Sequence, residues 1–133
     1  MNEWINDLCD LGAAGEPAVV VTVAGIRGSA PREIGAKMIV TAEATIGTIG
    51  GGQLEYQATR IAAGMLGDEQ LVLRSFPLGP ALGQCCGGVV EILFEPLAGE
   101  MPDWLRDLAA LHGQRVPAVM ATRISTTAPA KFV

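Results

Sequence analysis

The residues best suited to chemistry are two adjacent cysteines in the glycine-rich loop Gln84-Cys85-Cys86-Gly87-Gly88. A structural cysteine usually lies inside a packed helix or strand, whereas the glycines here let a ligand approach the backbone closely. The N–H groups of such a loop favour the thiolate form, which binds metals and attacks electrophiles. We therefore expect this loop to be functional, and to hold a ligand rather than to turn over a substrate.

The number and spacing of these thiols restrict the metals that they can bind. A structural zinc site needs four ligands, typically with Cys-x-x-Cys or His spacing, whereas this chain offers adjacent cysteines and one distant histidine, His112. A single soft thiolate suits a metal that already carries sulfur ligands of its own. His112 stands beside Gly113 at the end of a predicted helix, so we interpret it as a helix cap.

A second feature is the run Gly50, Gly51, Gly52, which precedes an amphipathic helical pattern. The first N–H groups of a helix have no partner within the helix, so together with the helix dipole they predict a site for phosphate or another anion. The alternative is a tight strand-to-helix turn, because the spacing matches no nucleotide-binding fingerprint. Glu55, in the first turn, either stabilises the helix dipole or accepts hydrogen bonds from the ring N–H groups of a pterin-like ligand.

A third feature is the group of positive charges formed by Arg27, Arg32 and Lys37, which only Glu33 opposes over the same stretch. The loop that carries Arg27 and Arg32 contains three glycines and a proline, and is predicted to follow a buried strand. This basic group is either a solvated loop or a local site for an anion.

The elements that position these loops are expected to form an α/β (mixed α+β) domain, in which helices pack on a mixed sheet. β-Branched or alternating runs predict strands, and the run at 18–24 predicts a central strand that is covered on both faces. Apolar residues at helical spacing predict the helices, the first of which buries Cys9. The predicted strands are 18–24, 37–41, 45–49, 70–76, 89–96 and one from 116, and the predicted helices cover the first dozen residues, 54–65 and 102–111.

The composition narrows the classes of protein. With 133 residues and 50% hydrophobic content, a single compact domain over residues 1–133 is expected. The net charge of −5 argues against a nucleic-acid partner, and no apolar run reaches the roughly 20 residues of a membrane span. The first basic residue is Arg27, unlike a signal or transit peptide, so we expect a cytoplasmic protein with reduced thiols. The strand-like ending APAKFV indicates a truncated chain.

Three segments together resemble the xanthine dehydrogenase accessory protein family, also known as the XdhC/CoxI family. They are VTVAGIRGSAPREIGAKMIV, GTIGGGQLE and LGQCCGGVVEILFEPL, and they span most of the chain. The resemblance implies a chaperone that shelters the molybdenum cofactor, or molybdopterin, and delivers it to a xanthine dehydrogenase-type molybdenum hydroxylase. It also implies a possible cysteine desulfurase partner and a possible homodimer. Family members often continue into a dinucleotide-binding-like carboxy-terminal domain, and from the resemblance we expect this chain to be truncated before that domain.

The resemblance also implies which residues bind the cofactor. The cysteine before the glycine pair recurs in the family and corresponds to Cys86, which would contact the molybdenum, whereas the position of Cys85 varies. The implied cofactor-binding residues are Gln84, Cys85, Cys86, Gly87, Gly88, Gly50, Gly51, Gly52, Glu55, Arg27, Ser29 and Arg32.

Two other classes of function remain open from the sequence. One is an enzyme, a cysteine-dependent sulfur transferase or a thiol redox protein, in which Cys85 and Cys86 act on a substrate. That reading leaves the glycine run unexplained and lacks an obvious base. The other is a protein-interaction domain without a ligand.

Overall fold

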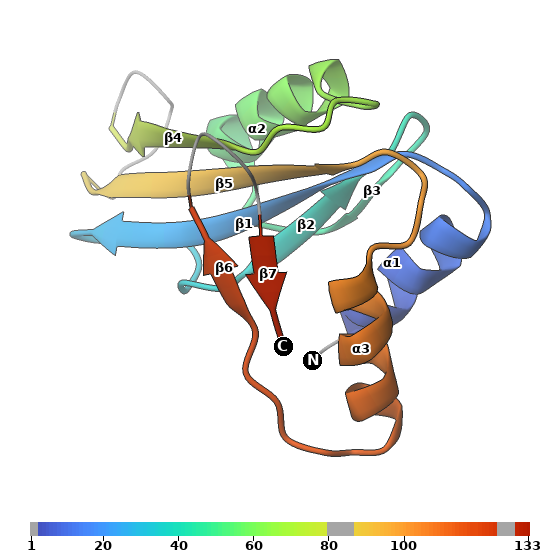
Figure 1. Ribbon diagram of the computed structural model, residues 1–133. Coiled ribbons are helices and arrows are strands. Elements are labelled where there is room, and N and C mark those ends of the chain that lie inside the picture. The colour runs from blue at the N-terminus through green and yellow to red at the C-terminus, as the bar shows by residue number, and fades with distance from the viewer. Residues whose placement is uncertain (1–2, 80–86, 125–129) are drawn as a thin grey trace.

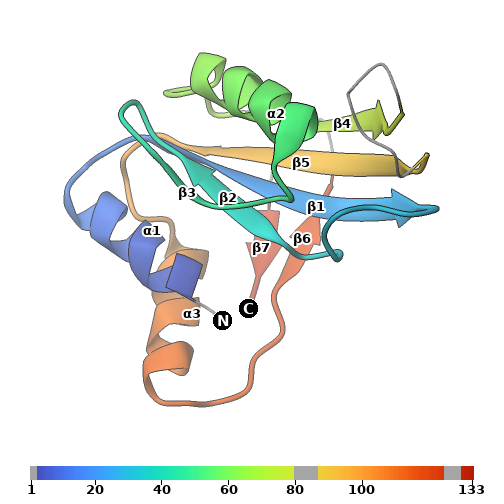
Figure 2. The same cartoon turned by 180° about the vertical axis from the view of Figure 1, so that it is seen from behind.

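The computed structural model describes residues 3–79, 87–124 and 130–133. Within these ranges the main sheet has five strands in the order β3-β2-β1-β5-β4, with a separate two-stranded pair, β6-β7, and three helices (Figures 1 and 2). The strands are β1 (Ala18–Arg27), β2 (Lys37–Val40), β3 (Thr45–Gly47), β4 (Val72–Pro77), β5 (Val89–Leu97), β6 (Ala121–Arg123) and β7 (Ala130–Phe132). The helices are α1 (Glu3–Ala13), α2 (Gly52–Gly64) and α3 (Asp103–Gly113).

The predicted α/β class is confirmed, but the expected mixed sheet is not, because neighbouring strands of the described sheet pair antiparallel. β1 and β2 are joined by a loop, as are β2 and β3, and α2 crosses from β3 to the far edge, where β4 leads back to β5. Within the described residues, the one parallel pairing is an isolated bridge between Ser29 and Gly87.

Helices cover both faces of the sheet (Figure 1). On one face, Val19, Val21 and Val23 of β1 pack beneath α2 in a large apolar cluster. On the other, Ala18 and Val20 pack against α1 and α3. The alternation of a strand sends successive side chains to opposite faces, and here both faces are buried, as predicted for this central strand.

A β-bulge interrupts β1 near its carboxyl end. Val23 pairs with Ile92 of β5, but Gly25 pairs with the next residue, Glu91, so Ala24 is an extra residue on β1. Beyond the bulge, Ile26 packs against the cluster beneath α2, although before it the odd-numbered residues do so. The strand stays paired to Arg27, three residues past the predicted end.

The strand predicted from Val116 is much shorter than expected. β6 covers only Ala121–Arg123, and Val119 is 83% exposed. The apolar pattern is strand-like from Val116, but only Ala121–Arg123 pair with another described strand, which is β7. Cys9, predicted to be in the core, is half-buried against the α1–α3 cluster, and burial followed by the charge of Asp10 raises the pKa of its thiol.

β7 is held to the main sheet by a buried ion pair. Lys131 Nζ lies 2.8 Å from Glu95 Oε2 on β5, and the two side chains are 8% and 9% exposed. Lys131 also donates to Thr122 Oγ1 of β6 at 2.6 Å and lies over the ring of Trp104 in α3. None of the helices in the described ranges is long and apolar enough to cross a membrane.

Candidate functional site

The segments singled out in the sequence meet at one end of the main sheet. Because the pairing is antiparallel, the carboxyl ends of β1 and β3 lie at the same end as the amino end of β5. The loop after β1, the glycine run after β3 and the glycines before β5 therefore gather there, beside the start of α2 (Figures 1 and 2).

The first junction is between the loop after β1 and the glycines before β5. A Cβ on Gly88 would overlap the carbonyl oxygen of Ser29 and lie 2.7 Å from that of Arg27. The carbonyl of Gly88 accepts a hydrogen bond from the N–H of Leu78 at 2.7 Å. Gly88 is thus clamped between β1 and the end of β4, a space that admits only glycine.

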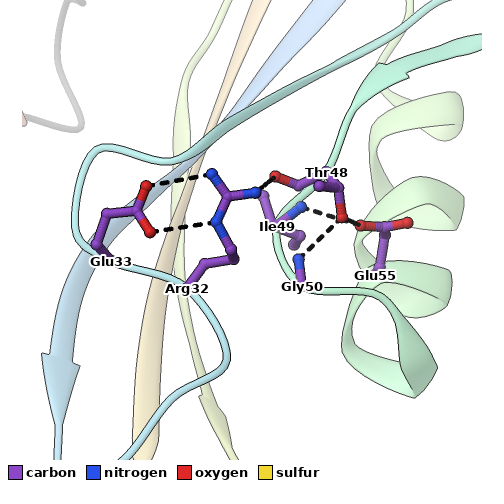
Figure 3. A network of polar contacts seen from close by, with 6 residues as sticks. All are labelled: Arg32, Glu33, Thr48, Ile49, Gly50 and Glu55. Carbon is purple, nitrogen blue, oxygen red and sulfur yellow. Dashed lines mark hydrogen bonds and ion pairs between the residues drawn. The ribbon is translucent and has the colours of Figure 1, made fainter. Parts of the chain in front are cut away.

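The second junction is between the same loop and the glycine run. A Cβ on Gly50 would lie 2.6 Å from Cγ of Pro31. Arg32 Nη1 donates to the carbonyl oxygen of Thr48 at 3.3 Å, and its Nη2 forms an ion pair with Glu33 at 3.1 Å (Figure 3). The hydrogen bond between Arg32 and Glu33 raises the pKa of the guanidinium and lowers that of the carboxyl. One loop therefore contacts both glycine segments.

The glycine run is closed by the carboxylate of Glu55 (Figure 3). Its Oε1 accepts hydrogen bonds from Thr48 Oγ1 at 2.5 Å, from the N–H of Ile49 at 2.9 Å and from that of Gly51 at 3.1 Å. Burial alone would raise the pKa of Glu55, but the hydrogen bonds from Thr48 and the backbone outweigh it and hold that pKa below its usual value. Of the two roles considered for Glu55, the structure shows the stabilising one. The carboxylate occupies N–H groups that the sequence offered to a phosphate.

Two glycines of the site have open space where a side chain would lie. Gly51 and Gly87 have φ angles of 75° and 70°, in the left-handed region, and a Cβ on either would meet nothing within 4 Å. Arg27 and Ser29 are exposed beside them, and Arg27 makes no ion pair with the described carboxylates. The site thus offers open backbone and a free cation, which fits an anionic ligand that lies close to the main chain.

One residue of the predicted basic group lies on a strand, whereas the two arginines lie at the end of β1 and in the loop that follows it. Lys37 lies on β2, where its Nζ is 5.2 Å from the ring centroid of Trp4 and 3.5 Å from Thr22 Oγ1. Burial, and next the charge of Lys131, lower the pKa of Lys37, against the opposite effect of Glu95. Sequence proximity placed Lys37 with Arg27 and Arg32, but its position on the strand turns it to the face of α1.

Thr48 is a site residue that the sequence did not single out. Its hydroxyl donates to Glu55 and accepts from the N–H of Gly50 at 3.0 Å. A threonine shortly before a helix with a glutamate in its first turn is the signal that could have found it, although the two residues are seven apart, farther than in a capping box. In the part of the chain that the structure describes, His, Cys, Asp and Glu side chains do not gather in a group of three that could hold a metal ion. Gln84, Cys85 and Cys86 lie outside the described residues.

Comparisons with known proteins identify a family and a similar fold. Residues 11–77 match the model of the XdhC and CoxI family, a range that ends before the cysteine loop. The crystal structure of a xanthine dehydrogenase from Bacillus halodurans has a similar fold, with a TM-score of 0.67 and 24% sequence identity. The similarity covers 83% of this chain but 34% of that protein, so this chain spans about a third of its length. No match was found among the curated proteins.

Proposed function

This chain belongs to the XdhC and CoxI family, and we propose that it binds the molybdenum cofactor, shelters it and delivers it to a xanthine dehydrogenase-type molybdenum hydroxylase. The observation that carries the proposal is the double contact of the loop after β1. That loop packs on Gly88 through Ser29 and on Gly50 through Pro31, so segments far apart in the sequence form one site.

The chemistry of the site fits this cargo. The molybdenum atom carries sulfur ligands from its pterin dithiolene, so it needs one further soft ligand, and we propose Cys86 for that role. Gly87, which follows Cys86 in the sequence, bridges to Ser29 in the site. The pterin would lie against the bare backbone of Gly51 and Gly87, and Arg27 supplies a positive charge beside it. The cofactor brings the redox chemistry, and the chain binds and shields it.

The second candidate function is enzymatic: a sulfur transferase or thiol redox protein that acts through Cys85 and Cys86. The Oε1 atom of Glu55 already accepts hydrogen bonds from Thr48 and two backbone N–H groups, which makes this carboxylate a poor candidate for the base. His112 lies in the last turn of α3, on an element that contributes nothing to the site. These positions favour a carrier.

The experiment that tests the proposal loads the full chain with isolated molybdenum cofactor and adds an apo-hydroxylase. A carrier activates the hydroxylase in proportion to the cofactor with which it was loaded, and molybdenum leaves the chain as activity appears. A contrary result is catalytic: trace amounts of the chain modify many equivalents of free cofactor, and the modified product accumulates. Direct measurement of molybdenum bound to the chain before transfer separates failure to bind from failure to deliver.

A further inference from the structure

A cavity of about 370 Å³ adjoins the candidate site on the side of α1. Its lining includes Arg32 and Thr48, which belong to the network in Figure 3, and also Trp4, Asp7 and Lys37. The cavity therefore connects the Arg32 side of the site with an amine that the site itself does not use.

The ammonium of Lys37 has fewer partners than its position requires. It has three donors, yet among the described residues its hydrogen bond is the 3.5 Å contact to Thr22 Oγ1, and it makes no ion pair with a carboxylate there. Lys131, the other lysine, is paired with Glu95 at 2.8 Å. A half-buried cation without an ion pair is costly unless a negative group reaches it. The cation–π contact with Trp4 at 5.2 Å compensates only in part.

The glycine run, the other place for an anion, is already occupied. The N–H groups of Ile49 and Gly51 donate to Glu55, so an incoming phosphate would have to displace a carboxylate that is bound within the same turn. Lys37 has no such competitor within ion-pair distance among the described residues.

We infer that this cavity is an oxyanion subsite in which Lys37 anchors a phosphate monoester. The identity of the rest of the ligand rests on the proposed function: the phosphate tail of the cofactor would lie here while its pterin lies at the glycines. Arg32, fixed by Glu33 and by the carbonyl of Thr48, is the second cation on the same lining.

Acidic side chains at the same cavity affect its affinity for phosphate. Asp7 and Glu3 of α1 also line it, and Glu33 is engaged with Arg32. Their negative charges weaken the binding of a phosphate, so removal of the Asp7 charge must strengthen it. This effect has the opposite sign to the loss of Lys37 and cannot come from unfolding.

The test titrates the full chain with inorganic phosphate at constant ionic strength and follows the indole N–H resonance of Trp4 by NMR. The wild-type chain shows a saturable shift with a dissociation constant in the range of about 1 to 10 mM, as expected for one or two ion contacts. Lys37→Met weakens binding at least about tenfold, Lys37→Arg restores most of it, and Asp7→Asn strengthens it about threefold. Arg106→Met, which removes an exposed cation of α3 outside the cavity, changes nothing. Acetate in place of phosphate separates a phosphate subsite from one for any carboxylate.

The inference is overturned if the wild-type shift does not saturate, if acetate binds as tightly as phosphate, or if Lys37→Met binds phosphate as well as the wild type. A second titration uses the isolated molybdenum cofactor. Equal cofactor affinity of the wild-type and Lys37→Met chains rejects this position for the phosphate tail while the proposed function stands. Absence of cofactor binding to the wild-type chain rejects the proposed function, and the phosphate titration still decides the subsite.

Discussion

The carboxylate of Glu55 accepts a hydrogen bond from the N–H of Gly51, four residues earlier, and so folds the start of α2 back on itself. The same oxygen also accepts from Thr48 and Ile49, which fixes the glycine run that precedes the helix. One side chain therefore sets the shape of a wall of the candidate site.

Glu55→Gln should lower the free energy of unfolding by about 1 to 2 kcal/mol at pH 7, because the amide oxygen accepts hydrogen bonds more weakly than a carboxylate. Urea denaturation followed by circular dichroism measures this change. Glu43→Gln is the matched control, since that glutamate is exposed and its side chain forms no ion pair with the described residues. Equal effects of the two substitutions would show that the Glu55 contacts contribute nothing to stability.

The stabilisation by Glu55 should also depend on pH. Its pKa is lowered in the folded state, so its contribution is complete above the unfolded value of about 4.3 and is lost as the pH falls through the folded value. The difference in stability between the wild type and Glu55→Gln therefore shrinks as the pH is lowered from 5 to about 3. Urea denaturation at several pH values checks this, and a constant difference contradicts it.

Gly88→Ala should destabilise the chain by about 2 kcal/mol or more, because the new Cβ overlaps the backbone of Ser29. Gly79→Ala is the control: a Cβ there meets nothing within 4 Å, and its φ is not positive, so its stability should stay within about 0.5 kcal/mol of the wild type. Thermal unfolding of both variants is the measurement. A Gly88→Ala chain of wild-type stability would disprove the close packing of the two loops.

The ion pair between Glu95 and Lys131 should be asymmetric. Glu95→Gln leaves Lys131 buried and repelled by Lys37, and is expected to cost about 3 to 5 kcal/mol. Lys131→Met should cost less, because Glu95 keeps the attraction of Lys37. Chemical denaturation of the single and double variants measures both the costs and the coupling. Equal costs for the two single variants would show that Lys37 has no influence on the pair.

Cys86→Ser should reduce the amount of molybdenum cofactor retained by the chain about tenfold, whereas Cys85→Ser should change it little. The reason is that the proposal gives one thiolate to the metal, at the position before Gly87. Elemental analysis of each variant after loading, at equal protein concentration, provides the measurement. Equal retention by both variants contradicts the assignment of Cys86.

Much of the fold could be predicted from local patterns. The β-branched run predicted β1, because that strand is buried on both faces. The apolar stripe predicted α2, because that helix buries one face at a regular period. The antiparallel order of the sheet could not be predicted, since pairing depends on how connections cross the sheet and not on the strands themselves. The strand from Val116 was overextended because an apolar pattern does not reveal whether a neighbouring strand exists.

The site was predictable only in part, for a related reason. Glycine spacing identified the segments that meet, because close packing restricts Gly50 and Gly88 to glycine and a left-handed φ favours glycine at Gly51. Two details depended on three-dimensional distance: the capture of the helix start by Glu55, and the contact of Lys37 with Trp4 of α1. Charge counted along the sequence grouped Lys37 with the two arginines but did not reveal its contact with α1.

The bulge at Ala24 acts as a change of phase in β1. Before it, odd-numbered residues face α2, and after it even-numbered ones do, as Ile26 shows. Deletion of a single residue there would restore a regular ribbon but rotate Arg27 and the loop that follows by half a turn, so that Ser29 and Pro31 would face away from Gly88 and Gly50. The number of residues in β1, which sets the face to which each side chain points, is therefore as important as the composition of the strand for bringing these loops into contact.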